Sequence, residues 1–183
     1  MDVKGTPIQG VKLVALKRFN DERGWFEESY REDVLTEAGI SDTFVQENMS
    51  FSADPGIVRG LHFQAPPASQ AKLVRVLQGS ILDVVVDLRR SSATFGRHFA
   101  VRLDAVQAQM LYVPIGLAHG FCTLEANTVV TYKVSSYYAP ALERRLLWND
   151  PALGIDWPSW EKEPILSAKD KVAPPFSDIE QFP

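Results

Sequence analysis

The chain has 183 residues, of which 45% are hydrophobic, and this is enough for one domain, spanning residues 1–183, with a substantial core. The formal net charge of −4 argues against a general nucleic-acid-binding protein. The single cysteine, Cys122, excludes an intrachain disulfide, and neither a signal peptide nor a membrane-spanning segment is apparent, so the sequence predicts a cytoplasmic protein.

One helix is expected early in the chain, over residues 31–38. This spacing places Val34, Leu35 and Ala38 on one face, and Gly39 suits the position that follows a helix C-terminus.

The middle of the chain predicts a series of short strands separated by turns. In residues 72–78, Lys72, Val74 and Val76 alternate with Leu73 and Leu77, so the two sets face opposite sides of a strand. Strands are expected over residues 72–78, 81–88, 98–103, 109–113, 120–124 and 128–135. Strands of this length and spacing predict an all-β sandwich or barrel.

The last part of the chain is rich in proline and tryptophan. Such a composition argues against disorder, because the aromatic side chains need to be buried. We expect this segment, after Trp148, to wrap the barrel as ordered loops and short helices.

Two segments stand where a cupin-type barrel would carry metal ligands, residues 59–64 and 114–120. They contain His62 and His119, but Gln64 replaces the second histidine of a His-x-His pair, and Lys72 stands where a carboxylate would be needed. A lysine near a metal site is repelled, whereas a lysine beside a developing oxyanion stabilises it. The pattern therefore favours proton chemistry, with no metal.

The other candidate residues each have a structural alternative. His119, between glycines, either contacts a ligand or ends a strand at a tight turn. Tyr132 shares a strand face with Val130 and Val134, so its phenol projects into a cavity if that face lines the barrel, and otherwise packs in the core. The charged run at residues 21–28 is a solvated loop, unless Arg23 binds a phosphate and Glu28 a sugar hydroxyl.

Several motifs occur in one order along nearly the whole chain, from about Ile8 to Pro174. They are Asp21-Glu22-Arg23-Gly24, Gln46-Glu47-Asn48-Met49-Ser50, Arg59-Gly60-Leu61-His62-Phe63-Gln64, Gln70-Ala71-Lys72-Leu73-Val74, Val86-Asp87-Leu88-Arg89, Thr94-Phe95-Gly96, Pro114-Ile115-Gly116-Leu117-Ala118-His119-Gly120-Phe121, Tyr132-Lys133 and Trp148-Asn149-Asp150-Pro151. This series resembles the dTDP-4-dehydrorhamnose 3,5-epimerase family. The resemblance implies a cupin-like jelly roll, a homodimer, no metal and no cofactor.

The resemblance also implies a reaction and its residues. The substrate would be a dTDP-4-keto-6-deoxyhexose, epimerised at C3 and C5 to dTDP-4-dehydro-L-rhamnose for dTDP-L-rhamnose biosynthesis. His62 would be the general base, Asp170 the carboxylate that orients it, Tyr132 the proton donor on the opposite face, and Lys72 the group that stabilises the enolate. The implied substrate-contacting residues are Phe19, Arg23, Glu28, Gln46, Asn48, Arg59, His119, Glu143 and Lys169, with Phe19 beside the nucleotide of a neighbouring subunit.

Elementary chemistry agrees with these roles. A C–H bond beside a ketone is acidic only if the enolate is stabilised, and inversion needs two proton carriers on opposite faces of the sugar. The alternatives are an epimerase that acts at C3 or C5 only, a metal-dependent cupin with His62 and His119 as ligands, and a non-catalytic nucleotide-sugar-binding protein.

Overall fold

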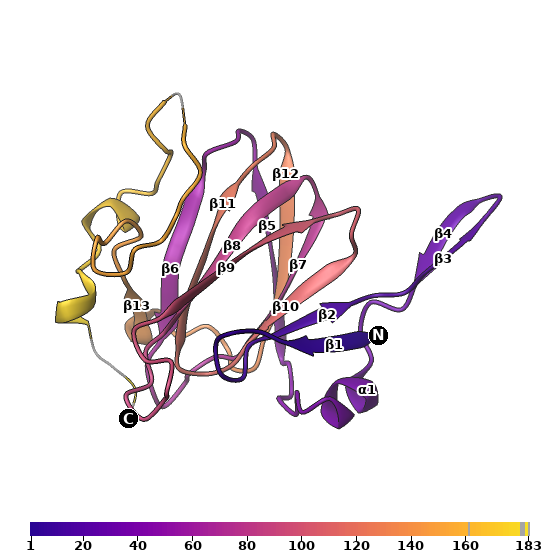
Figure 1. The fold of residues 1–183 in the computed structure, drawn as a ribbon, viewed down its shortest axis with the longest axis horizontal. Helices are drawn as coiled ribbons and strands as arrows, with labels where there is room; N and C mark the ends of the chain where they lie inside the picture. Colours follow the sequence, from indigo (N-terminus) through magenta and orange to yellow (C-terminus); the bar gives the residue numbers. More distant parts are fainter. Residues whose placement is uncertain (161, 180–181, 183) are drawn as a thin grey trace.

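Two antiparallel sheets form the body of the molecule, a computed structural model that describes residues 1–160, 162–179 and 182 (Figure 1). The first sheet has six strands, in the spatial order β1 (Asp2–Gly5), β2 (Lys12–Ala15), β10 (Gln109–Val113), β7 (Lys72–Gln78), β12 (Thr128–Val134) and β5 (Gln46–Ser52). The second has five, in the order β13 (Glu143–Arg145), β6 (Val58–Gln64), β11 (Leu117–Thr123), β8 (Ser80–Asp87) and β9 (His98–Asp104).

The apolar core lies between the facing surfaces of these sheets. Val74 and Val130 come from the six-stranded sheet and pack with Ile81, Val85 and other residues of the five-stranded sheet. This follows from strand alternation, because every second residue of each strand points to the same face. The predicted all-β jelly roll is confirmed, and so are the expected strands, with small shifts at their ends.

The largest of these shifts concerns β11, which begins at Leu117 instead of Gly120. Gly116, with a φ of 92°, completes the preceding turn and allows the strand to start directly after it. The strand therefore includes His119 in its interior, whereas the structural alternative drawn from the sequence placed this residue at the end of a strand.

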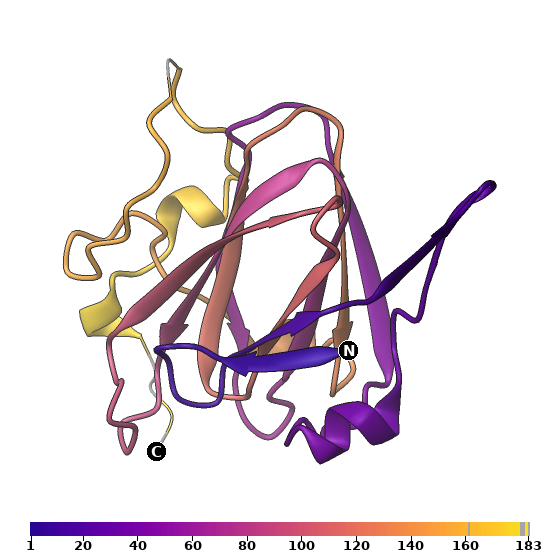
Figure 2. The ribbon, with the colours of Figure 1, turned by 45° about the vertical axis from the view of Figure 1, so that its right-hand side comes forward.

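The described part of the segment that follows β13 covers the outer face of the five-stranded sheet, as expected for the chain after Trp148 (Figure 2). Leu146, Leu153 and Ile179 of this segment pack against Leu61 and Val84 of the sheet. The described part of this segment contains the short 3₁₀ helices η2 (Asp170–Val172) and η3 (Phe176–Asp178), while a third, η1 (Pro140–Leu142), precedes β13.

The predicted helix is confirmed as α1 (Glu32–Glu37), and Gly39 follows it with a φ of 76°. Leu35 is the buried residue of α1 and packs with Val14, Leu73 and Tyr112 of the six-stranded sheet. Within the described ranges, no helix is long and apolar enough to cross a membrane.

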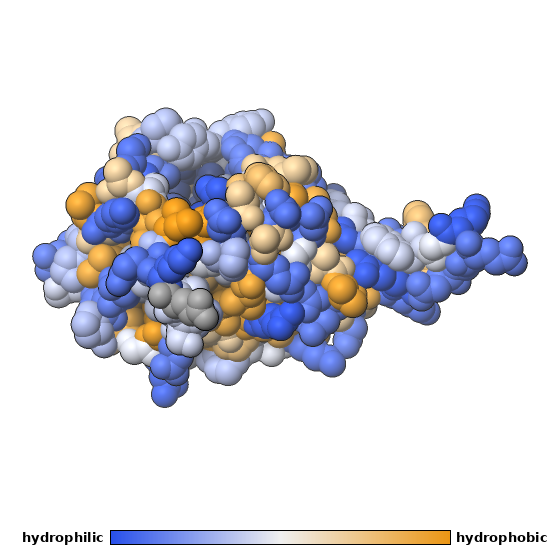
Figure 3. All heavy atoms as spheres, turned by 90° about the horizontal axis from the view of Figure 1, so that it is seen from above, coloured by the Kyte–Doolittle hydropathy of each residue, from blue (hydrophilic) through white to orange (hydrophobic). Residues whose placement is uncertain are grey.

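A hairpin of β3 (Arg18–Asp21) and β4 (Gly24–Glu27) projects from the body as an arm (Figures 1 and 3). The sequence predicted only a charged turn at this place. At the base of the arm, Glu27 forms ion pairs with Arg18 and Arg75, and Arg75 lies on the outer face of β7. The buried ion pair between Glu27 and Arg75 attaches the arm to the six-stranded sheet, and the pair with Arg18 joins the two strands of the arm.

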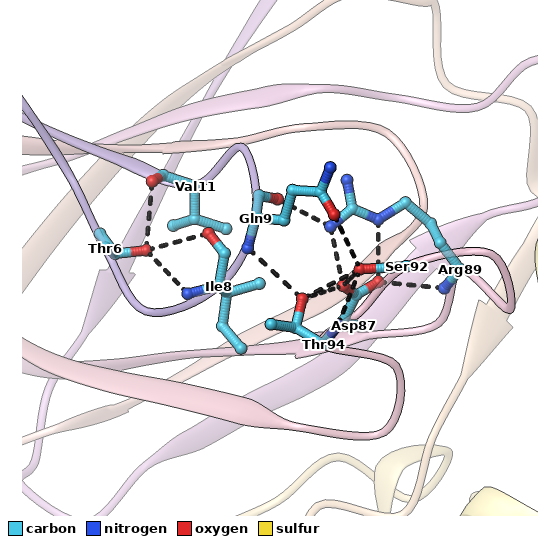
Figure 4. A network of polar contacts seen from close by, with 8 residues as sticks. All are labelled: Thr6, Ile8, Gln9, Val11, Asp87, Arg89, Ser92 and Thr94. Atoms are coloured by element: carbon cyan, nitrogen blue, oxygen red, sulfur yellow. Dashed lines mark hydrogen bonds and ion pairs between the residues drawn. The ribbon is translucent and has the colours of Figure 1, made fainter.

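A polar network closes one end of the barrel (Figure 4). Asp87, fully buried at the end of β8, accepts hydrogen bonds from Arg89, Ser92 and Thr94, and Arg89 also donates to the backbone oxygen of Gln9. Burial would raise the pKa of Asp87, but these hydrogen bonds outweigh it and lower the pKa to about 2. Asp87 is thus a structural carboxylate with all its partners in place.

Candidate active site

A cavity of about 530 Å³ lies between the two sheets and beneath the segment 165–170. Its lining is polar and contains both signs of charge: Ser50, Ile57, Val58, Arg59, His62, Lys72, His119, Phe121, Tyr132, Glu143, Arg145, Ile165, Leu166, Ser167 and Asp170. A smaller recess of about 80 Å³ shares four of these residues and extends to Asn48 and Tyr138. Both are large enough, taken together, for a hexose and part of a nucleotide.

His62 lies on β6 and is held by a carboxylate from the distant C-terminal segment. Its Nε2 lies 2.7 Å from Oδ1 of Asp170, the first residue of η2. The His62 side chain is 30% exposed and that of Asp170 only 5%. Because the buried carboxylate accepts the Nε2 proton, Nδ1 is the ring nitrogen that can receive a proton from a substrate.

Asp170 is tuned by its surroundings. Burial would raise its pKa, but the hydrogen bonds from His62 and Ser167 and the charge of Arg145 outweigh burial and hold the pKa below its ordinary value. Asp170 is therefore ionised when His62 is ready to accept a proton.

His119 forms a second histidine–carboxylate pair, deeper in the barrel. Its Nε2 lies 2.6 Å from Oδ1 of Asp83, on the neighbouring strand β8. The side chain of His119 is 7% exposed and that of Asp83 is not exposed, and Oδ2 of Asp83 has no hydrogen-bond partner among the described residues.

Glycine explains why His62 and His119 are close neighbours. The two histidines stand directly opposite each other on β6 and β11, just before a register shift in that pairing. At Gly60, whose φ is 132°, an added Cβ would lie 2.5 Å from the Cα of Gly120. Only glycine permits this approach, so these two residues serve the contact between strands that brings the histidines together.

Lys72 connects the two sheets at the cavity. It starts β7, is 8% exposed, and its Nζ donates to the backbone oxygen of His62 at 3.2 Å. Burial lowers the pKa of Lys72 to about 8, although the charges of Asp83 and Glu143 act in the opposite direction. Below pH 8 the cavity thus contains a buried ammonium. One of its N–H groups donates to the backbone of His62, and the others can donate to a ligand.

Tyr132 lies on β12, in the sheet opposite to His62, and both side chains line the same cavity. Burial raises the pKa of Tyr132, the charge of Arg59 lowers it, and the charges of Glu143 and Tyr138 raise it, with a net increase. The phenol therefore keeps its proton at neutral pH.

Comparisons with known proteins fit this geometry. The family profile described as dTDP-4-dehydrorhamnose 3,5-epimerase matches residues 5–178. The chain belongs to the dTDP-4-dehydrorhamnose 3,5-epimerase family. Its relative in Salmonella typhimurium, with the same name, is 46% identical over 175 residues, which is 95% of this chain and 94% of the relative.

Solved structures of family members have the same fold. A Bacillus anthracis dTDP-4-dehydrorhamnose 3,5-epimerase with TDP and PPi bound has a TM-score of 0.92 and 46% identity, covering 95% of this chain and 98% of that one. A Legionella pneumophila 3,5-epimerase in complex with dTDP-4-keto-L-rhamnose has a TM-score of 0.93 and 40% identity, covering 98% and 94%. A 3′-monoepimerase from Streptomyces bikiniensis in complex with dTDP-quinovose has a TM-score of 0.86 and 35% identity, covering 94% and 86%.

Most residues predicted from the family resemblance lie in or beside the cavity of this epimerase. Arg59, His119 and Glu143 line it, and Asn48 lines the adjoining recess. Gln46 lies outside both linings, where its amide donates to Asn48 and accepts from the backbone N–H of Tyr138. Lys169 lines a separate cleft of about 500 Å³ that shares Glu143 and Arg145 with the cavity.

Three predicted residues of the epimerase lie elsewhere. Phe19 and Arg23 are on the projecting arm, and Glu28 follows it. The Arg23 side chain is 89% exposed, and among the described residues it forms an ion pair only with Asp21, in the same hairpin. Within one chain these residues do not line the cavity.

Sequence reasoning missed three residues of the site. Asp83 lies in a mostly apolar strand, on the same face as Ile81 and Val85, which point into the core. A charged residue on such a face is the signal in the sequence that could have identified it. Arg145 and Tyr138 lie in or near a three-residue edge strand, too short for any periodic pattern.

In this chain Gln64 occupies the position where a metal-binding cupin has the second histidine of its His-x-His pair. Gln64 does not face the two histidines as a ligand: its amide donates to the backbone oxygens of Ala68 and Tyr137 and accepts from Ala139 N–H. Across the described residues, no group of three His, Cys, Asp or Glu side chains is arranged to hold a metal ion.

Proposed function

We propose that this chain converts dTDP-4-dehydro-6-deoxy-D-glucose to dTDP-4-dehydro-L-rhamnose by epimerisation at C3 and C5, a step of dTDP-L-rhamnose biosynthesis. The observation that carries the proposal is the placement of His62 and Tyr132 on opposing sheets of one cavity, which Lys72 also lines. A sugar ring held between the sheets presents one face to the imidazole and the other to the phenol.

In the proposed mechanism, His62 removes the proton from the carbon next to the C4 ketone. The electron pair of the C–H bond moves onto the ketone oxygen and forms an enolate. In this mechanism the Lys72 ammonium stabilises the oxyanion together with a doubly protonated His119, whose Nε2–H donates to Asp83 and whose Nδ1–H donates to the oxyanion. Removing one such donor typically costs about 100- to 1000-fold in rate.

Tyr132 then delivers its phenolic proton to the opposite face of the same carbon, and the configuration inverts. Solvent restores the neutral imidazole and the phenol before the next carbon reacts. Asp170 keeps His62 oriented and stabilises the imidazolium while it exists.

For substrate binding, we propose two groups of residues. Arg59 and Lys169 supply positive charge for the diphosphate, while Gln46, Asn48 and Glu143 offer hydrogen bonds to sugar or base. Tyr138, 52% exposed beside Asn48, provides an aromatic surface for the nucleobase.

A homodimer would explain the arm. The outer face of the six-stranded sheet exposes Met49, Phe51 and Leu77, and the arm exposes Phe19 and Phe26. Exposed aromatic and aliphatic side chains in this number are typical of an interface. We propose that a second copy covers this face and that each arm carries Phe19, Arg23 and Glu28 to the partner's cavity. Gel filtration and an Arg23→Ala variant with a raised KM would support this assembly.

The decisive experiment for the activity is turnover in deuterated water with the dTDP-4-keto sugar. We expect deuterium at both C3 and C5 of the product, because each carbon receives its new proton from an exchangeable group. No label at either carbon would end the proposal, and nucleotide binding without exchange would indicate a binding protein.

Label at one carbon only would favour a C3- or C5-only epimerase, which is the second candidate because a 3′-monoepimerase is among the similar structures. Tyr132→Phe gives an independent test of the two-face mechanism. It should retain exchange at the first carbon but lose epimerisation. A cytoplasmic location stays a prediction, which fractionation of the producing cells would test.

A further inference from the structure

A row of three side chains crosses the five-stranded sheet at the floor of the cavity. His119 of β11 stands opposite His62 of β6, and His62 stands opposite Arg145 of the edge strand β13. Directly opposed residues of antiparallel strands project to the same face, and all three line the cavity. Neither the family resemblance nor the mechanism above gives Arg145 a role.

Arg145 contacts two carboxylates of this site. Its Nε lies 3.4 Å from Oδ1 of Asp170, the same oxygen that lies 2.7 Å from His62 Nε2. Its Nη2 forms a close ion pair with Glu143, two residues earlier on β13. The Arg145 side chain is 21% exposed and Asp170 is 5% exposed, so solvent screens the contact with Asp170 only in part.

The guanidinium acts on Asp170 by charge rather than by a hydrogen bond. At 3.4 Å the Nε–Oδ1 contact is an ion pair, and Arg145 Nε is buried without a hydrogen-bond partner among the described residues. No other Lys or Arg side chain in the described part of the chain lies within ion-pair distance of Asp170.

Asp170 needs such support because its own segment is weakly attached. Residues 165–169 are mostly exposed, and a single backbone bridge between Ile57 and Ile165 pairs this segment with the barrel. Asp170 begins a 3₁₀ helix of only three residues, and its N–H bonds to Ser167 in the same segment. Arg145 is part of the sheet, so its ion pair connects the Asp170 carboxylate to strand β13.

We propose that Arg145 is a positioning residue for the proton-accepting pair: it holds Asp170 against His62 and favours the form of the pair that lacks the extra proton. This inference rests on the proposed epimerase function. The chain of contacts is His62, Asp170, Arg145 and Glu143, from the cavity to the sheet edge.

The sign of the charge effect follows from the arrangement. The charge of Arg145 helps to lower the pKa of Asp170, and removing this positive charge should let the pair take up a proton more readily in the variant. The other titratable or charged groups that line the same cavity are Arg59 on β6, Lys72 on β7, His119 on β11, Tyr132 on β12 and Glu143 on β13. Of these groups Glu143 alone forms an ion pair with Arg145 among the described residues, so a substitution of Arg145 removes two charge contacts, one with Asp170 and one with Glu143.

The experiment compares Arg145→Gln and Arg145→Lys with the unaltered enzyme, measuring kcat, KM and the pH–rate profile with the dTDP-4-keto sugar. Arg145→Gln should lower kcat by about 10- to 100-fold, since the base is no longer held in place, and should leave KM nearly unchanged. The acidic limb of its profile should move to higher pH by about one unit. Arg145→Lys should recover the position of the limb but only part of kcat, because lysine keeps the charge without the planar fork.

Arg144→Gln is the matched control, on the same edge strand but opposite Phe63 and outside the cavity lining. It should leave kcat and the acidic limb unchanged. An equal loss in Arg144→Gln would mean that the edge strand, not the Arg145 guanidinium, matters, and would overturn the proposal. So would an Arg145→Gln enzyme with unchanged kcat and an unchanged limb.

A double variant tests whether Arg145 acts through Asp170, and Arg145→Lys, which keeps the positive charge, supplies the kinetic comparison if Arg145→Gln does not fold. Arg145→Gln with Asp170→Asn removes both charges, and it should be no slower than Asp170→Asn alone, because Arg145 acts through Asp170. A further tenfold loss in the double variant would overturn the proposal. Failure of the unaltered enzyme to exchange substrate protons in deuterated water would instead reject the epimerase function itself.

Discussion

The two histidine–carboxylate pairs of the cavity consist of the same groups but differ in exposure and in origin. His62 is 30% exposed and its carboxylate comes from a short helix 108 residues later in the chain. His119 is 7% exposed and its carboxylate comes from the next strand of the same sheet. A proton carrier has to reach solvent to reset, whereas a fixed hydrogen-bond donor gains from being buried. The comparison teaches that the environment, not the pair of residue types, decides between a base and an oxyanion donor.

The largest expected effect is that of removing each imidazole in turn. His62→Ala should lower kcat by about 100- to 10,000-fold and abolish exchange of substrate protons, with dTDP binding retained. His119→Ala should lower kcat less, by about 100-fold, and should retain slow exchange at the reacting carbons. Near-normal turnover of His62→Ala, or loss of all exchange only in His119→Ala, would reverse the assignment of the two pairs.

The carboxylates provide a finer test. Asp170→Asn should cost about 100-fold in kcat, because an amide neither orients the tautomer nor stabilises the imidazolium. Asp83→Asn should cost about tenfold, since His119 does not change its protonation in the proposed reaction. Equal losses, measured at saturating substrate, would show that both histidines carry protons.

The buried lysine predicts an alkaline limit to activity. Because burial lowers the pKa of Lys72 to about 8, the ammonium loses its proton near that pH and the enolate loses its stabilisation. We expect kcat to fall about tenfold for each pH unit above 8. Lys72→Met should be slow at every pH and should lack this limb, while a limb that persists in the variant would belong to another group.

The smallest effect on rate is expected at Asp87, which serves as a control for Asp83 on the same strand. Asp87→Asn should lower the free energy of unfolding by about 3 kcal/mol, since it breaks a buried, fully bonded ion pair with Arg89. Its kcat per folded molecule should stay unchanged. Denaturant unfolding and kinetics on the same sample would separate the two outcomes, and a large loss of kcat would connect the barrel end with the site.

Local patterns explain why much of the fold could be predicted. In β7, β8 and β12, alternation separated the two faces of each strand correctly, but it left open whether the face of Tyr132 lines a cavity, which the structure shows that it does. Short strands without alternation, such as β1 and β13, escaped prediction, because three or four residues carry too little periodic signal.

The sequence by itself determined the all-β class, the family and the identity of most charged residues in the cavity, because motifs and strand parity are local properties. Only the tertiary structure showed that His62 contacts Asp170, 108 residues later in the chain, and that Asp83 and Arg145 lie beside the two histidines and Asp170. It also showed that Phe19 and Arg23 lie on an arm that projects away from the cavity of the same chain. These facts depend on strand order and register between distant segments, and the free energy of such long-range packing is not encoded in any single stretch of the chain.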